Sequence, residues 1–209
     1  MSEIMKKTIF IAAIAVTFSL TAFGQAKKMT VRDYFLAIPT EHIKADAKKR
    51  AAWIESEWAE EGYLSFDIPV KEITGEDGDG KVFGSVQLFN KKSGAIIGVA
   101  TNMCEEGVCQ GQLLFLDYKG GAWEDVTSDH APMIDNDEVI SILRKAPAFE
   151  EKSKLKDGVE VPIFYQFSGG DKVLSAVAGG RNGDGGVAVK AFKWNGTVFN
   201  EYEYPESPE

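Results

Sequence analysis

The stretch from Val82 to Thr127 reads VFGSVQLFNKKSGAIIGVATNMCEEGVCQGQLLFLDYKGGAWEDVT. Apolar residues alternate with polar or small residues, and glycine-containing turns interrupt the alternation. This pattern predicts four antiparallel β-strands in a meander, over about residues 82–90, 95–103, 110–118 and 122–127. The last turn, Tyr118-Lys119-Gly120-Gly121-Ala122-Trp123, has an aromatic residue on each side of a glycine pair, which is typical of a tight hairpin.

A similar pattern returns 76 residues later and ends in Trp194-Asn195-Gly196-Thr197-Val198-Phe199. At this offset apolar positions, turn glycines and aromatic residues coincide, in the pairs Ile97 with Val173, Thr101 with Val177, Leu113 with Val189, Leu116 with Phe192, Tyr118 with Trp194, Gly120 with Gly196 and Trp123 with Phe199. The first strand of the second copy alternates at Val159, Val161, Ile163 and Tyr165, which fits an offset of 75. The sequence therefore predicts an internal repeat.

Helices are predicted ahead of both groups of strands. Thr30 and Asp33 form a capping box at the start of the first helix, which Pro39 ends. A longer helix is predicted over about residues 41–60, with an apolar stripe of Ile43, Ala47, Ala51, Ile54 and Trp58 and with Gly62 as its C-terminal cap. A strand over 63–70 follows it. A third helix begins at Asp135 and ends before Pro147.

These elements predict an α+β fold of two tandem units, each a helix plus a four-stranded antiparallel meander, with the helices packed on one face of the sheet or sheets. The first unit covers residues 25–130 and has the extra helix and strand, and the second covers 131–204. Residues 205–209 are predicted to be a disordered tail. The expected core residues are Leu114, Leu116, Ile97, Val99, Phe192, Val173 and Val177.

The first 24 residues have the pattern of a secretory signal peptide. Lys6 and Lys7 precede an apolar run from Thr8 to Phe23, and Ala22-Phe23-Gly24 places cleavage before Gln25. A membrane anchor is the alternative, but the run of about sixteen residues is shorter than the roughly twenty that a span requires. We therefore expect a periplasmic or secreted protein with no membrane span after removal of the signal.

The chain is acidic, with a formal net charge of −9. Binding to nucleic acid or to an anionic membrane depends on clustered lysine and arginine, so this charge argues against both partners. The basic run Lys48-Lys49-Arg50 is interpreted as a solvated helix face, with a docking surface as the alternative.

Cys104 and Cys109 are the two cysteines of the chain, and they flank a predicted hairpin tip. In an oxidising compartment they are expected to form a structural disulfide. A redox site would favour two intervening residues rather than four, and a zinc site would need more ligands than these cysteines with His42 and His130. The segments 76–80 and 182–185 resemble the start of a calcium loop but are interpreted as turns. No metal or cofactor is expected.

Ser128, Asp129 and His130 have the residue types of a catalytic triad, but neighbouring side chains diverge, whereas a working triad is assembled from separate elements. We therefore expect a non-catalytic binding module that acts on a cell-envelope protein or glycan. The alternative is a secreted hydrolase with a carboxylate-based site between the two units. The candidate binding residues are the aromatic residues of the two hairpins, Tyr118, Trp123, Trp194 and Phe199, which could form an exposed patch or simply stabilise the hairpins.

Two resemblances add to this reading. The run TVRDYFLAIP at 30–39, followed by GYLSFD at 62–67, resembles uncharacterised secreted bacterial proteins, which have no assigned activity. The predicted layout of helices and four-stranded sheets, repeated and carrying a disulfide, is similar to that of the secreted β-lactamase inhibitor protein. The single disulfide and the inserted helix depart from that layout, and no inhibitory motif carries over to residues of this chain.

Overall fold

The computed structural model describes residues 28–58, 62–74, 80–91, 94–105, 108–147, 149, 155–178 and 186–203. The helices are α2 (Val31–Ala37), α3 (Ala47–Trp53), α4 (Lys71–Thr74), α5 (Thr127–His130) and α6 (Asn136–Lys145), with a 3₁₀ turn η2 (Gly169–Asp171). The strands are β1 (Ile54–Trp58), β2 (Tyr63–Ile68), β3 (Lys81–Lys91), β4 (Gly94–Glu105), β5 (Val108–Lys119), β6 (Ala122–Asp125), β7 (Ile163–Phe167), β8 (Val173–Ala178), β9 (Val187–Trp194) and β10 (Phe199–Glu201).

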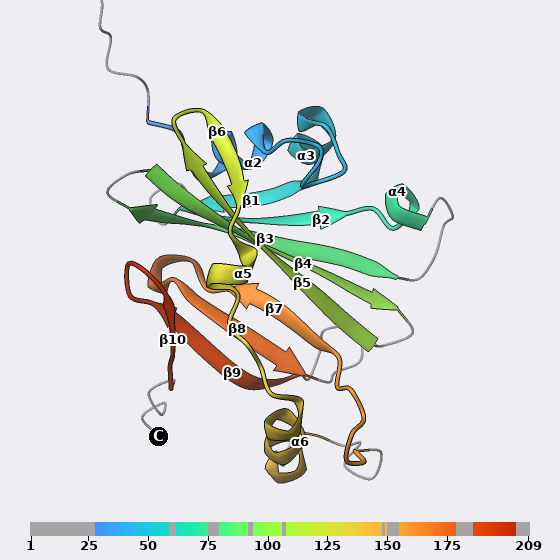
Figure 1. Ribbon diagram of the computed structural model, residues 1–209. Helices are drawn as coiled ribbons and strands as arrows, with labels where there is room; N and C mark the ends of the chain where they lie inside the picture. The colour runs from blue at the N-terminus through green and yellow to red at the C-terminus, as the bar shows by residue number, and fades with distance from the viewer. Residues whose placement is uncertain are drawn as a thin grey trace, which may run out of the picture.

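The strands form two antiparallel sheets, so the protein is α+β. The larger sheet has six strands in the order β1-β2-β3-β4-β5-β6, and the smaller has four in the order β10-β9-β8-β7. Figure 1 shows helices α2 and α3 above the larger sheet, the smaller sheet below it, and α6 at the far end of the smaller sheet. The predicted strands of the first meander are confirmed as β3 to β6, and the predicted strand over 63–70 as β2.

Helix α2 begins as its sequence predicts. The hydroxyl of Thr30 accepts a hydrogen bond from the backbone N–H of Asp33 (3.2 Å), and the carboxylate of Asp33 accepts one from the N–H of Thr30 (2.9 Å). The two bonds satisfy backbone donors that have no partner within the helix. The capping box is therefore confirmed.

The helix predicted over 41–60 is wrong in both of its bounds. Asp46 caps α3, accepting a hydrogen bond from the N–H of Lys49 (2.8 Å), and the helix ends at Trp53. From Ile54 the backbone pairs with β2, with Trp58 opposite Tyr63. The edge of the sheet offers this segment hydrogen-bond partners from outside its own sequence, and such tertiary pairing overrides helix propensity. Gly62, at φ +64°, precedes a strand instead of capping a helix.

Arg50 corrects the interpretation of the basic run at 48–50. Lys48 and Lys49 are exposed, but Arg50 is buried. Its Nη2 donates hydrogen bonds to the carbonyl oxygens of Leu36 (2.9 Å) and Ile38 (2.6 Å). Arg50 therefore ties α3 to the end of α2 and belongs neither to a solvated face nor to a docking surface.

Successive residues of the larger sheet point to opposite faces and enter different layers of the core. One face packs under α2 and α3 through Leu64, Phe66, Val86, Ile97, Val99 and Leu116. The other face meets the smaller sheet, where Phe89, Ile96 and Phe115 pack with Phe167, Leu174, Phe192 and Trp194. Of the expected core residues, Leu114 and Val177 are half-buried and the other five are buried.

Two glycines let strand β7 cross the larger sheet at close range. A Cβ atom at Gly98 would lie 2.7 Å from the ring of Phe167, and one at Gly111 would lie 2.8 Å from the Cα of Phe164. Beside them, the buried Asn102 side chain donates to the carbonyl oxygen of Tyr165 (2.7 Å) and accepts from its N–H (2.9 Å). This side chain acts as a ladder partner for the edge of β7, so backbone groups buried there are satisfied.

The two hairpins share one register at the offset of 76 residues. Tyr118 lies opposite Trp123, and Trp194 lies opposite Phe199. In β8 a bulge between Ala176 and Val177 shifts the pairing with β9 by one residue. Phe192 therefore lies opposite Leu174, whereas Leu116, its equivalent in the first unit, lies opposite Ile97, the equivalent of Val173. Tyr118 and Trp123 pack in the same hydrophobic cluster as Leu116, two residues before Tyr118 on β5. Trp194 and Phe199 likewise pack in one cluster with Phe192.

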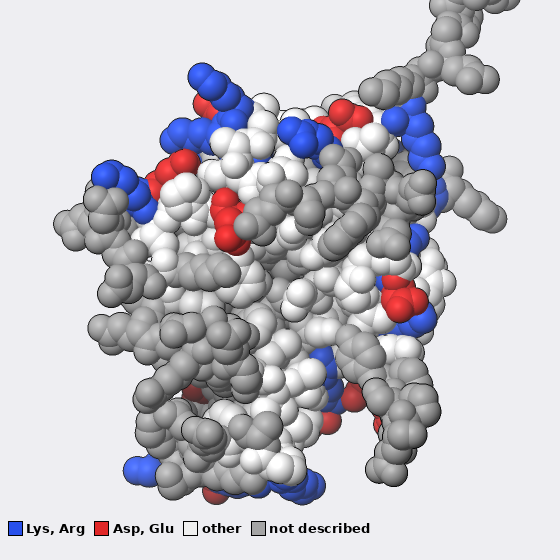
Figure 2. Space-filling view, turned by 180° about the vertical axis from the view of Figure 1, so that it is seen from behind, with Lys and Arg blue, Asp and Glu red and all other residues white. Residues whose placement is uncertain are grey.

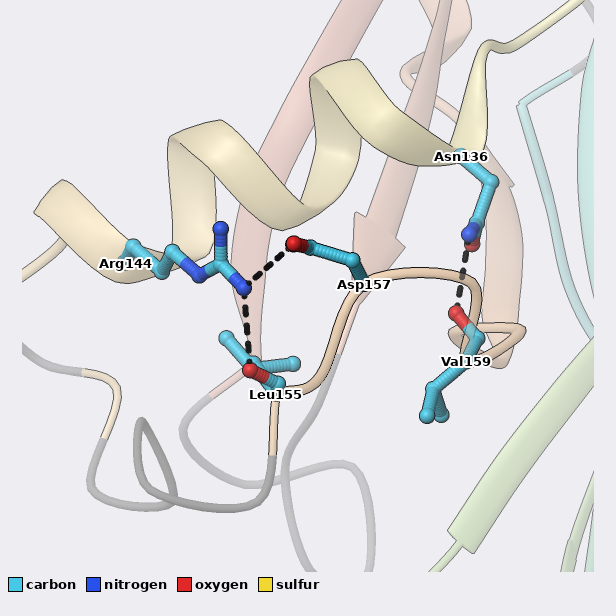
Figure 3. A network of polar contacts seen from close by, with 5 residues as sticks. All are labelled: Asn136, Arg144, Leu155, Asp157 and Val159. Atoms are coloured by element: carbon cyan, nitrogen blue, oxygen red, sulfur yellow. Dashed lines mark hydrogen bonds and ion pairs between the residues drawn. The ribbon is translucent and has the colours of Figure 1, made fainter.

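The strand predicted from Val159 begins later, at Ile163. Pro162 lacks an N–H donor, and the segment before it runs along α6 (Figure 3). Asn136, at the start of α6, donates to the carbonyl oxygen of Val159 (2.8 Å), and Arg144, near its end, donates to the carbonyl oxygen of Leu155 (3.1 Å) and to Asp157 (2.8 Å). These bonds hold the segment as an extended strap on the helix, so Val159 does not join the sheet and is 43% exposed.

Several predictions lie outside the described residues. They concern the signal peptide at 1–24, the turns at 76–79 and 182–185, and the tail at 205–209. None of the helices in the described ranges is long and apolar enough to span a membrane.

Candidate ligand-binding pocket

A pocket of about 380 Å³ opens between the helical layer and the larger sheet. Its walls come from the α2–α3 turn, α3, α4 and strands β2, β4 and β5. Phe35 of α2 and Lys49 and Trp53 of α3 line the pocket on the helical side. Sequence positions from 35 to 114 therefore meet at one place.

The floor of the pocket is apolar because it is a continuation of the core. Phe66 and Val99 point from β2 and β4 toward the helices, and both are buried. The ring of Phe35 stacks on that of Phe66, with centroids 5.2 Å apart and planes inclined by 21°, and Trp53 lies at 6.5 Å from Phe66. The half-buried Leu114 completes the floor from β5.

The rim of the pocket is polar and includes two lysines. The turn between the helices contributes His42 and Lys44, and α3 contributes Lys49. Within the described ranges neither Lys44 nor Lys49 takes part in an ion pair. Figure 2 shows Lys and Arg side chains at the end of the molecule where the helices lie in Figure 1, with Asp and Glu side chains among them.

Two further features shape the rim. The indole N–H of Trp53 donates to the carboxylate of Glu72 (3.4 Å), which links α3 to α4 across the pocket wall. His42 is 16% exposed at its side chain and lies 3.7 Å from the carboxylate of Glu41.

The strand side of the mouth is uncharged. Thr101 on β4 and Gln112 on β5 lie opposite one another in the ladder, and both line the pocket. Such a combination, an apolar floor with a few polar groups at its edge, is typical of pockets that bind small molecules or single groups of a partner. In the described part of the chain no cluster of three metal-ligating side chains occurs.

The predicted binding residues Tyr118 and Trp123 lie outside this pocket. Their ring centroids are 4.9 Å apart, and Tyr34 of α2 meets them edge-on at 5.4 and 6.4 Å. All three side chains are half-buried. Burial raises the pKa of Tyr34, and the neighbouring Tyr118 raises it further. The pair therefore packs against α2 and leaves part of its surface accessible.

Trp194 and Phe199 lie in a different layer from Tyr118 and Trp123. The Trp194 side chain is 8% exposed and packs between the sheets against Phe89 (5.0 Å between centroids), Phe199 (5.2 Å) and His130 (5.5 Å). The structure therefore does not bring the four predicted aromatic residues into one patch. Trp194 packs as a core side chain.

The predicted disulfide is confirmed. Cys104 and Cys109 are directly opposite on β4 and β5, with their Cα atoms 4.0 Å apart, and are joined through sulfur. Both are buried beside Phe164 of the smaller sheet. The disulfide lies at the end of the longest hairpin and is separate from the pocket.

The consecutive Ser128, Asp129 and His130 do not form a triad. The Ser128 hydroxyl is 3.5 Å from the carboxylate of Asp129, while the His130 ring packs on Trp194. Between the sheets, Asp117 forms an ion pair with Lys91 (2.5 Å). Asp117 is the one buried carboxylate in the described ranges, so these ranges contain no pair of facing buried carboxylates.

Sequence reasoning missed the pocket. Its one local signal is the alternation His42-Ile43-Lys44-Ala45, in which polar and apolar residues share a turn, with a lysine in an otherwise acidic chain. Comparisons with protein-family models, curated proteins and solved structures find no match to this chain. The function is therefore argued from the geometry of the pocket.

Proposed function

We propose that the protein is a secreted, non-catalytic binding module that acts on a protein or glycan of the cell envelope. The observation that carries this proposal is the pocket beside α2 and α3. It receives an apolar group of the partner on Phe35, Phe66 and Val99, while the polar rim orients that group. No chemical step on the bound partner is part of the proposal.

The properties of the pocket support this role. Its volume of about 380 Å³ falls within the range of roughly 300–1,000 Å³ that is usual for ligand pockets. Its floor is built on rigid elements, since the rings of Phe35 and Phe66 stack and Trp53 is fixed by its bond to Glu72. A site with little freedom to rearrange loses little conformational entropy when a ligand binds.

The proposal includes a periplasmic or secreted location and an internal repeat. The predicted signal at 1–24 and the Cys104–Cys109 disulfide support a periplasmic or secreted protein. The shared register of the two aromatic hairpins supports an internal repeat. Tyr118 and Trp123 are the aromatic pair whose partial exposure would let a partner extend its contact beyond the pocket.

Affinity capture from a cell-envelope extract tests the proposal. A Thr101→Phe variant places a bulky ring in the mouth of the pocket, and Thr197→Phe adds the same ring on an exposed turn. We expect the wild type and Thr197→Phe to recover the same partner and Thr101→Phe to lose it. Equal recovery by Thr101→Phe, with an unchanged melting temperature, would exclude the pocket as the binding site.

A further inference from the structure

We infer that the group that enters the pocket is an anionic amphiphile, an apolar body that ends in a single carboxylate. This inference rests on the proposed function, because it assumes that the pocket is the binding site. It adds the chemical class of the ligand and the position of its charge.

The two ammonium groups of the rim lie on one side. Lys44 and Lys49, like His42, come from the α2–α3 turn and α3, whereas Thr101 and Gln112 form the strand side. Lys44 and Lys49 have no ion-pair partner in the described ranges. A bound carboxylate on the helix side would face these ammonium groups.

One acidic residue, Glu72, also lines the pocket, and the two lysines exceed it by one positive charge (two lysines minus one glutamate). The carboxylate of Glu72 accepts the hydrogen bond of the Trp53 indole. The pocket therefore differs from the rest of a chain whose formal net charge is −9. Local positive charge on a negative protein favours an anion at this mouth and repels a cation.

The floor of the pocket determines the apolar part of the ligand. The rings of Phe35, Trp53 and Phe66 and the side chains of Val99 and Leu114 offer hydrophobic contact and few hydrogen bonds. Burying a charge on this floor would be costly, because a desolvated charge needs a partner. The ligand must therefore keep its apolar part inside and its charge at the rim.

A free acyl chain and the carboxyl-terminal residue of a protein both have this chemistry, and we assign the ligand to the second, because the proposed partner is a protein or glycan. Decanoate represents the first, with decanol as its neutral counterpart, and N-acetylphenylalanine represents the second, with its amide as the neutral counterpart. We expect isothermal titration calorimetry to show tighter binding of N-acetylphenylalanine than of its amide. Preference for the acid in the decanoate pair alone would identify a free acyl chain and contradict the protein partner.

Variants locate the charge. Lys44→Gln and Lys49→Gln should each weaken binding of the acid by about two- to fivefold, as expected for a partly exposed ion pair, and leave the neutral counterpart unchanged. Lys119→Gln, on the exposed turn of the β5–β6 hairpin, is the control and should change neither. Added salt should weaken binding of the acid and leave binding of its neutral counterpart unchanged.

The outcomes separate this inference from the proposed function. Equal binding of acid and neutral counterpart in both pairs, or no binding of any of the four probes, would overturn the anionic ligand. The proposed function would then stand or fall on the capture experiment with Thr101→Phe. Loss of partner capture in Thr101→Phe together with charge-independent probe binding would keep the pocket and reject its charge preference.

Discussion

Tyr118 faces Trp123 across the β5–β6 turn, just as Trp194 faces Phe199 across the β9–β10 turn. The surroundings of the two hairpins nevertheless differ. Tyr118 and Trp123 are half-buried against Tyr34 of α2, whereas Trp194 is buried between the two sheets. One hairpin pattern thus holds a helix in one place and joins two sheets in another, because the face of the sheet that is covered differs.

The largest expected effect on stability is at the β9–β10 hairpin, the inner hairpin, which is buried between the sheets. Trp194→Ala removes a buried ring that contacts Phe89, Phe199 and His130, and should lower the free energy of unfolding by about 3–5 kcal/mol. Urea denaturation measures this value. Because the sheets share a core, we expect a single transition. A loss below 1 kcal/mol, or two separate transitions, would contradict the burial of this hairpin between the sheets.

The contact between the sheets can be weakened without touching an aromatic ring. Asn102→Leu keeps the size of a buried side chain but leaves the N–H and carbonyl groups of Tyr165 without their partner. Each orphaned group should cost about 1–3 kcal/mol. Asn90→Leu, at an exposed position of β3, is the control and should stay within about 0.5 kcal/mol of the wild type. Equal effects of the two variants would show that Asn102 does not join the sheets.

The β5–β6 hairpin, the outer hairpin, should be more tolerant of substitution. Trp123→Ala removes a half-exposed ring and its cross-strand pair with Tyr118, and should cost about 1 kcal/mol. Acrylamide quenching gives a second measure, because the fluorescence of Trp123 should be quenched more readily than that of Trp194. Equal costs for Trp123→Ala and Trp194→Ala would remove the distinction between the hairpins.

The smallest expected effects are pH-dependent losses of stability, at acid pH through the β9–β10 hairpin and at alkaline pH through the β5–β6 hairpin. Burial lowers the pKa of His130 beside Trp194; Asp129 opposes this shift, Lys91 adds to it and Asp117 opposes it. The folded protein then binds fewer protons than the unfolded chain, so stability should fall as pH decreases through about 6.5. Urea midpoints at pH 7.5 and 5.5 measure the fall, and His130→Gln should reduce it.

At the outer hairpin the sign is reversed. The raised pKa of Tyr34 means that the folded state retains a proton that the unfolded chain releases, so stability should fall as pH rises through about 10. Tyr34→Phe should reduce this alkaline loss and leave the acid limb unchanged. Part of the loss should remain, because burial also raises the pKa of Tyr63 and of Tyr165. An alkaline loss of unchanged size in Tyr34→Phe would assign all of it to other groups.

The parts of the fold that depend on neighbours along the chain could be predicted from sequence. The capping box of Thr30, the strand alternation through Leu116 and the Cys104–Cys109 pair are of this kind. The strand at 54–58 could not, because its hydrogen-bond partners lie on β2 and its own sequence has a helical pattern. The buried Arg50 likewise depends on carbonyl oxygens of another helix.

The candidate site was predictable only in part. The aromatic hairpins were found because each is a local pattern, but the face that each ring covers depends on which layer packs above it. The floor of the pocket has no local pattern, since Phe35, Phe66, Val99 and Leu114 come from separate elements. Its cationic rim gains meaning only from its position beside that floor.

An NMR titration of the protein with N-acetylphenylalanine tests most directly whether the pocket, rather than the aromatic hairpins, is the binding surface. The pocket predicts that chemical-shift changes concentrate at Phe35, Lys49, Thr101 and Leu114, and that Trp123 and Trp194 move little. Changes centred on Tyr118 and Trp123, with the pocket residues unperturbed, would contradict this assignment and place the binding surface on the outer hairpin.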